Sequence, residues 1–101
     1  MSLSKIDLRT FQGFDWDHGN HCKNWEKHSV SQTECEQIFF NQPLLIQDDF
    51  KHSDAEIRYL ALGKTNQSRL LFIAFTQRLN LIRVISARDM SKKERLFYEN
   101  A

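Results

Sequence analysis

The chain has 101 residues, of which 41% are hydrophobic and 27% charged. This composition predicts one small globular domain over residues 1–101, with residues 1–10 as a candidate loose tail. No apolar run approaches the roughly 18 residues of a membrane span, and no signal-peptide pattern opens the chain. Two cysteines do not make a disulfide framework, so we expect a reducing, cytoplasmic environment.

The net charge of +1 hides a division of charge along the chain. Residues 1–57 carry five Lys/Arg and ten Asp/Glu, a net charge of −5. Residues 58–101 carry nine Lys/Arg, six of them Arg, and three Asp/Glu, a net charge of +6. This asymmetry fits a basic face that meets phosphate or a polyanion, but it equally fits an acidic half that folds back on a basic half.

The first half of the chain predicts one strand and two helices. Aromatic residues favour a short strand over residues 11–16. Asp17 is a plausible N-cap for a helix over residues 18–28. The capping box Ser31-x-x-Glu34 predicts a second helix that ends at about residue 40.

The second half predicts strands followed by a last helix. Four strands are expected, the last three in meander order: residues 44–46, 56–62, 70–75 and 81–87. A second capping box, Ser91-x-x-Glu94, predicts a helix through about Tyr98. The fold class is therefore α+β: a small antiparallel sheet, with a meander of three C-terminal strands and one or two N-terminal strands, two N-terminal helices and one C-terminal helix.

Several kinds of chemistry lack a motif in this sequence. His18, His21 and Cys22 form the densest group of metal-ligand residues, but no CxxC, HExxH or second ligand pair accompanies them. We therefore interpret His18 and His21 as solvated histidines on a helix surface rather than as metal ligands. No Gly-rich phosphate loop and no G-x-S-x-G elbow is present, so neither a metal nor a cofactor is expected.

Arginines on neighbouring strands are the strongest functional feature. Arg58, Arg83 and Arg88 lie in or at the ends of predicted strands, and Arg78 lies in the turn between two of them. A guanidinium group keeps its charge and grips phosphate with a planar fork. Several on one sheet face could bind an RNA backbone and stabilise a pentavalent phosphate.

A structural role for the same arginines is the alternative. Arg58 could pair with Glu56 or Asp54, and Arg88 with Asp89 or Glu94. Positions 83 and 88 differ by an odd number, so a regular strand would direct the two side chains to opposite faces. They share a face only if the strand ends or bulges near residues 86–87.

Three groups of residues, spanning about residues 14–98, resemble motifs of the BrnT family of bacterial toxins. The groups are Phe14-Asp-Trp16-Asp17 with Asn24-x-x-Lys27-His28-x-Val30; His52-Ser53-x-x-Glu56-x-Arg58 with Leu62-Gly63; and Arg83-x-Ile85-Ser86-Ala87-Arg88 with Glu94-Arg95-x-x-Tyr98. The resemblance implies a ribonuclease toxin of a type II toxin–antitoxin pair with a fold like the RelE superfamily. Such toxins cut RNA without a metal, by attack of the ribose 2′-hydroxyl on the adjacent phosphate.

The resemblance also implies partners and site residues. The partners are RNA and a BrnA-like ribbon-helix-helix antitoxin, through which operator DNA is contacted; no membrane is involved. The expected catalytic residues are Arg58, Arg83, Arg88, His28 and Tyr98. The RNA-binding residues expected from the motifs are Lys27 and His52, with Glu56 orienting Arg58. Arg78 and Lys92, which lie outside the motifs, are also expected to bind RNA. The alternatives are a non-catalytic basic interaction module and an inactive relic that keeps only antitoxin binding.

Overall fold

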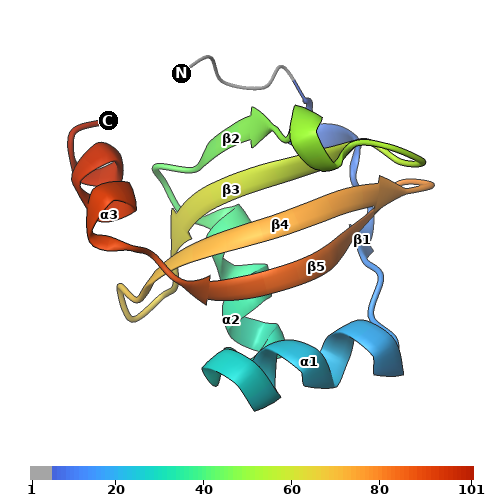
Figure 1. Cartoon of the computed structure of the whole chain (residues 1–101), viewed down its shortest axis with the longest axis horizontal. Helices are drawn as coiled ribbons and strands as arrows, with labels where there is room; N and C mark the ends of the chain where they lie inside the picture. The colour runs from blue at the N-terminus through green and yellow to red at the C-terminus, as the bar shows by residue number, and fades with distance from the viewer. Residues whose placement is uncertain (1–5) are drawn as a thin grey trace.

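The computed structural model describes residues 6–101, apart from the side chains of residues 22–25. Five strands form a single sheet in the order β1-β5-β4-β3-β2, with helices around it (Figure 1). The strands are Gly13–Phe14 (β1), Leu45–Asp48 (β2), Arg58–Lys64 (β3), Leu70–Arg78 (β4) and Leu81–Asp89 (β5). The helices are His18–His28 (α1), Gln32–Gln37 (α2) and Lys92–Glu99 (α3), with 3₁₀ turns at Leu8–Thr10 (η1), Ile38–Phe40 (η2) and Phe50–His52 (η3). The predicted α+β class is confirmed.

Each α-helix begins at the cap that its sequence predicts. The Ser31 hydroxyl accepts from the N–H of Glu34, and the Glu34 carboxylate accepts from the N–H of Ser31. Ser91 and Glu94 repeat this reciprocal pair at the start of α3. The Asp17 carboxylate accepts from two N–H groups of the first turn of α1. These bonds satisfy donors that the first turn of a helix otherwise leaves free.

The sheet is mixed, so the expectation of an antiparallel sheet is wrong at one strand. β1 runs parallel to β5, with Gly13 opposite Leu81 and Phe14 opposite Ile82. The other three pairings are antiparallel, as predicted. Alternation of side chains shows that a stretch is a strand but carries no information on its direction. The direction of β1 is decided by the path of the chain, which passes through α1 and α2 before the meander begins.

One face of the sheet, the covered face, packs against α2 and η2, which lie behind the sheet in Figure 1. Leu71, Ile73 and Phe75 of β4 point to this face and are fully buried, together with Cys35 and Ile38 from the helical side. Gly63 on β3 is required for this approach, because a Cβ there would lie 2.9 Å from the Ile38 Cβ. Burial raises the pKa of the Cys35 thiol to about 12, so Cys35 acts as a small apolar core residue.

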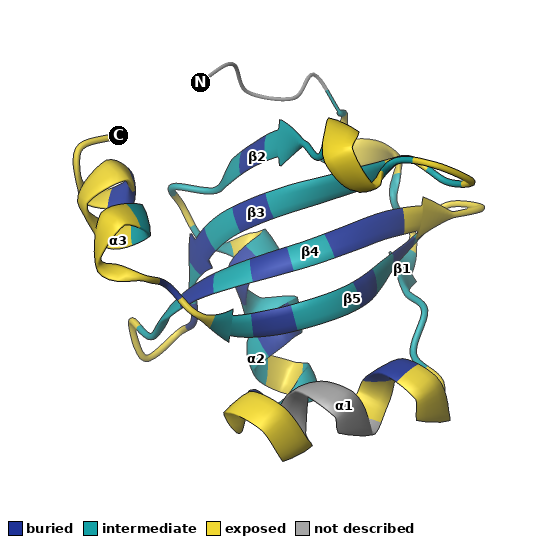
Figure 2. Ribbon diagram, in the orientation of Figure 1, coloured by how far each residue is buried: buried dark blue, intermediate teal, exposed yellow. Residues whose placement is uncertain are grey.

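On the opposite face, the open face, no helix of the described residues crosses the centre of the sheet (Figure 1). Leu60, Leu62, Phe72 and Ala74 on this face are only partly buried, so buried and intermediate residues alternate along β4 (Figure 2). α3 flanks the open face at one end of the strands, and α1 runs beside β5 (Figure 1). A half-covered sheet face of this kind leaves room for a ligand.

The segment before β1 is partly attached to the domain. Residues 8–10 form η1, whose N-cap Asp7 accepts from the N–H of Arg9, and Ile6 and Leu8 pack against the core. The half of the predicted tail that the structure describes is therefore anchored by apolar contacts. No helix in the described part of the chain is long and apolar enough to cross a membrane.

Candidate functional site

A β-bulge in β5 brings Arg83 and Arg88 to the same face of the sheet. Ala74 of β4 lies opposite Ser86, and Phe75 lies opposite Val84, so Ile85 is an extra residue with no partner in the register. One inserted residue reverses the parity of the strand beyond it. Of the two conditions under which Arg83 and Arg88 can share a face, the structure shows the bulge.

Arg58 and Arg83 flank one threonine on the open face. Arg58 of β3 and Arg83 of β5 are both in register with Thr76 on the central strand β4. Two strand spacings separate their Cα atoms, about 10 Å. Thr76 is 1% exposed between them, and its hydroxyl donates to the Ile57 carbonyl oxygen at 2.7 Å. We refer to Arg58, Thr76 and Arg83 as the arginine row.

The cap of α1 holds Arg83 in place. Arg83 Nη2 donates to Asp17 Oδ1 at 3.1 Å, and Nη1 lies 2.9 Å from Asp17 Oδ2 and 3.6 Å from Asp15 Oδ1. The hydrogen bond from Arg83 is the main reason why the pKa of Asp17 is lowered. Asn20, which is buried, ties this turn to the bulge by donating to the Val84 carbonyl oxygen. Asp17 was expected only as a helix cap, and its second role is visible only in the fold.

Both arginines of the row keep a buried N–H group with no acceptor. Arg58 Nε and Arg83 Nη1 are the buried side-chain nitrogens that have no hydrogen-bond partner among the described residues. The Arg83 Nη1 contact with Asp17 is close, but its N–H groups are not aligned with the carboxylate, so it is an ion pair without a hydrogen bond. Buried polar groups are normally satisfied, so two such donors on one face call for an acceptor.

A polar pocket of about 430 Å³ adjoins the row at Arg58. His52, Glu56 and Arg78 line it together with Arg58. Arg78 Nε lies 3.8 Å from the Glu56 carboxylate, so Glu56 faces Arg78, and no ion pair joins it to Arg58 among the described residues. Because they line the same pocket as Arg58, the predicted RNA-binding residues His52 and Arg78 both lie beside the arginine row.

Arg88 shares the open face but not the row. It lies in register with Phe72, four residues from Thr76 along β4, or about 13 Å. Its Nη1 and Nη2 donate to the two oxygens of Glu94 at 2.8 and 2.9 Å, and its guanidinium lies 4.1 Å from the Phe72 ring centre. The hydrogen bond to Glu94 raises the pKa of Arg88. These contacts attach α3 to the sheet, as the structural alternative predicted.

Tyr98 is directed into the packing of α3. It is 5% exposed, and its hydroxyl donates to the Pro43 carbonyl oxygen at 2.6 Å. Burial raises the pKa of this phenol, which therefore stays protonated near neutral pH.

We expect Tyr98→Phe to leave RNA cleavage unchanged and to lower the free energy of unfolding by about 1 kcal/mol, the net contribution of one hydrogen bond. Thermal unfolding and cleavage of the same RNA by wild type and variant measure the two effects. A large loss of cleavage with unchanged stability would instead give the phenol the catalytic role that the resemblance implies.

Lys27, His28 and Lys92 lie apart from the arginine row. Lys27 and His28 are exposed at the C-terminal end of α1, about 15 Å along the helix from Asp17. His28 lies near Asp89, whose pKa is lowered first by Arg69 and to a smaller extent by His28. Lys92 is exposed in the first turn of α3. Their predicted roles require RNA to extend well beyond the row.

Arg69 is a structural residue that the sequence did not identify. It donates to both oxygens of Asp89, to Glu34 and to the carbonyl oxygens of His28 and Ser29. The residue therefore joins the ends of α1 and β5 to the start of α2. No local signal marks it, because its partners lie 20 to 41 positions away in the sequence.

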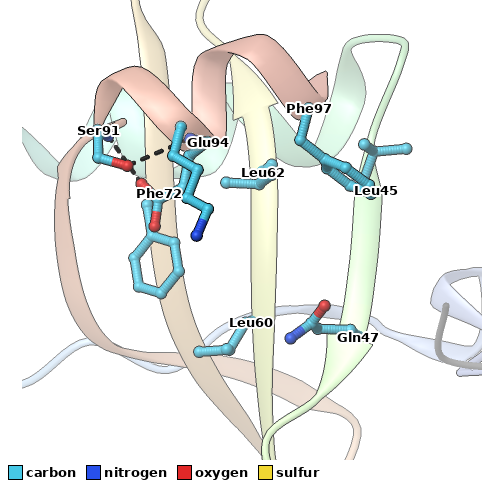
Figure 3. Close-up of a pocket in the computed structure, with 9 residues that line it drawn as sticks. Leu45, Gln47, Leu60, Leu62, Phe72, Ser91, Glu94 and Phe97 are labelled. Atoms are coloured by element: carbon cyan, nitrogen blue, oxygen red, sulfur yellow. Dashed lines mark hydrogen bonds between the residues drawn. The ribbon is translucent and has the colours of Figure 1, made fainter. Parts of the chain in front are cut away.

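A second pocket on the open face is apolar. It has a volume of about 410 Å³ and lies between the sheet and α3, where Leu45, Leu60, Leu62, Phe72 and Phe97 surround it (Figure 3). Lys93 and Glu94 stand at its border, but Glu94 is already bonded to Arg88. The polar side chains of its lining that can donate a hydrogen bond, Gln47, Ser91 and Lys93, include no arginine, whereas the row has two. We therefore place the candidate site at the arginine row.

Metal ligands do not gather in the part of the chain that the structure describes. Within it, no three His, Cys, Asp or Glu side chains lie close enough together to hold a metal ion. His18 and His21 are both exposed on α1, and the side chain of Cys22, the third member of the predicted cluster, lies outside the described residues.

The fold and site define a small α+β domain that presents unsatisfied guanidinium donors on an open sheet face. Residues 16–94 match the family described as ribonuclease toxin, BrnT, of type II toxin-antitoxin system. Since the match covers most of the chain, the protein belongs to this family: it is a ribonuclease toxin, with RNA as its target and an antitoxin as its partner. A comparison with curated proteins found no match.

Proposed function

We propose that this toxin cleaves RNA by transesterification, without a metal ion, and that Arg58 and Arg83 bind the phosphate that reacts. The observation that carries the proposal is the pair of buried, unsatisfied N–H groups on these two arginines. Phosphate oxygens are acceptors that match the planar forks of these arginines. The register puts both residues on the open face, on either side of Thr76.

The chemistry is an in-line displacement at phosphorus. The ribose 2′-oxygen forms a bond to phosphorus, the bond to the 5′-oxygen breaks, and the products are a 2′,3′-cyclic phosphate and a 5′-hydroxyl. Negative charge on the phosphoryl oxygens rises in the transition state. Fixed guanidinium groups stabilise that charge without having to reorganise, which is the main source of catalysis expected here. Asp17 holds the Arg83 fork in a set orientation for this purpose.

The test is cleavage of an end-labelled RNA by purified protein in the presence of EDTA. We expect fragments with cyclic phosphate and 5′-hydroxyl ends, identified by mass. The matched control is the same sequence with a 2′-O-methyl group at every ribose, which should stay intact because the attacking hydroxyl is blocked. Cleavage of this control, or 3′-hydroxyl ends, would contradict the mechanism. Intact RNA together with tight antitoxin binding would favour an inactive relic.

The finer identity of the partner rests on the family resemblance. We propose that the antitoxin carries a ribbon-helix-helix domain, like BrnA, and that operator DNA is contacted through it. We also propose that the toxin acts in the cytoplasm, where its RNA substrate is found. A small adjacent reading frame with a ribbon-helix-helix pattern would support this assignment, and its absence would count against it.

A further inference from the structure

A compact turn beside the arginine row holds a histidine and an aspartate together. His52 Nδ1 lies 2.8 Å from Asp49 Oδ2. A carboxylate only accepts hydrogen bonds, so Nδ1 carries the hydrogen in this contact, and in the neutral imidazole the free lone pair is then on Nε2. The His52 side chain is 61% exposed, whereas the Asp49 side chain is 12% exposed. The imidazole is therefore open to a ligand while the carboxylate that orients it is shielded from solvent.

The backbone of Arg58 anchors this turn directly. The Asp49 N–H donates to the Arg58 carbonyl oxygen at 2.9 Å, and the Arg58 N–H donates to Ser53 Oγ at 2.9 Å. Ser53 Oγ in turn donates to the Asp49 carbonyl oxygen at 2.7 Å. The three bonds close a ring that fixes the 49–53 turn against the first residue of β3. His52 is thus positioned relative to Arg58 by backbone geometry.

The surroundings of His52 combine an anion-binding side with an acidic side. Arg58 and Arg78 line the same pocket and offer positive charge, and Asp54 and Glu56 border it. Arg78 faces Glu56 at 3.8 Å, which leaves Arg58 as the guanidinium with an unsatisfied buried donor in this pocket. A phosphate held at Arg58 would place the adjoining ribose within the same pocket as the imidazole.

We infer that His52, oriented by Asp49, is the general base that takes the proton from the attacking 2′-hydroxyl. This inference rests on the proposed function and names the group that it leaves open. As the 2′-oxygen bonds to phosphorus, its proton moves to His52 Nε2. The 5′-oxygen leaves with the electron pair of its bond to phosphorus and takes a proton from water. Asp49 stabilises the imidazolium that forms, as a carboxylate does for an imidazole in a catalytic triad.

The test compares His52→Gln with a matched change at an exposed histidine of α1, His21→Gln. General base catalysis contributes about 10²–10⁴-fold, so His52→Gln should lower kcat by this factor with little change in KM. The His21→Gln variant should cut RNA at the wild-type rate. Added imidazole should restore part of the activity to a His52→Gly variant, since it can occupy the space of the missing side chain.

Asp49→Asn tests the positioning role. An amide can also donate, so it no longer selects the tautomer with a free Nε2. We expect kcat to fall at least about tenfold while KM and the melting temperature change little. A higher KM or a lower melting temperature with unchanged kcat would show that Asp49 only supports the turn.

The outcomes separate this inference from the proposed function. An active wild type whose His52→Gln variant keeps full kcat would overturn the assignment of His52 and leave the arginine row intact. A wild type that cuts no RNA would overturn both. Loss of activity in both Arg58→Ala and His52→Gln, with imidazole rescue only for the glycine variant at position 52, is the expected pattern.

Discussion

Replacing Arg83 with alanine should reduce kcat for RNA cleavage by about 10²–10³-fold, the usual effect of removing one fixed donor to transition-state charge. The variant should remain folded, because Asp17 still caps α1 through the N–H groups of Gly19 and Asn20. Steady-state cleavage of a defined RNA and thermal unfolding measure the two quantities. Arg83→Lys should fall between wild type and alanine, since an ammonium group keeps the charge but not the planar fork.

The control for this prediction is Arg9→Ala. Arg9 is 91% exposed and pairs with Asp7 on the surface, so its loss removes the same charge away from the row. We also expect the Arg58→Ala and Arg83→Ala effects to combine less than multiplicatively, because both residues act on one phosphate. Wild-type kcat in the Arg83→Ala protein would show that Arg83 is a structural partner of α1.

Replacing Arg69 with methionine should lower the free energy of unfolding by about 3 kcal/mol, because it removes hydrogen bonds to two carboxylates, Glu34 and Asp89, and leaves two backbone carbonyl oxygens without this donor. The Arg69 side chain is 28% exposed. For a domain of this length, the melting temperature should fall by more than about 10 °C. Below that temperature the variant should still cut RNA, since Arg69 lies far from the row in the fold.

Lowering the pH should weaken the contacts of Arg69 with Glu34 and Asp89. The hydrogen bond from Arg69 lowers the pKa of Asp89. For Glu34, burial raises the pKa, but the bonds from Ser31 and Arg69 outweigh it and the net shift is downward. A lowered folded-state pKa stabilises the protein above the ordinary carboxyl value near 4, and this contribution is lost as the pH falls through the folded values. The fall in the free energy of unfolding on acidification should therefore be smaller in Arg69→Met than in wild type.

The matched control for Arg69 is Arg95→Met on α3, where the side chain is exposed. Isolated surface charges contribute little to stability, so this variant should melt within a few degrees of wild type. Equal melting temperatures for Arg69→Met and wild type would mean that the bonds around Arg69 do not hold α1, α2 and β5 together.

The sequence alone was sufficient for the elements that depend on near neighbours. The caps at Asp17, Ser31 and Ser91 involve residues two or three positions away, and all three helices begin where these caps predict. The meander follows from alternating side chains and turn residues. The sequence also stated when a bulge is needed: positions 83 and 88 differ by an odd number, so their side chains can share a face only on an irregular strand.

Only the tertiary structure decided what each arginine on that shared face does. Arg88 meets Glu94, six positions away, and anchors α3, whereas Arg83 meets Asp17, 66 positions away, and keeps one buried N–H free. The same holds for the parallel β1 and for the link between Arg58 and the turn that carries His52. Residue types and spacing state which groups could pair, but the choice among partners depends on which segments the sheet brings side by side. The sequence thus determined the helices, the meander and the positions of the arginines, and the packing of distant segments determined which acidic partner Arg83 and Arg88 each meet.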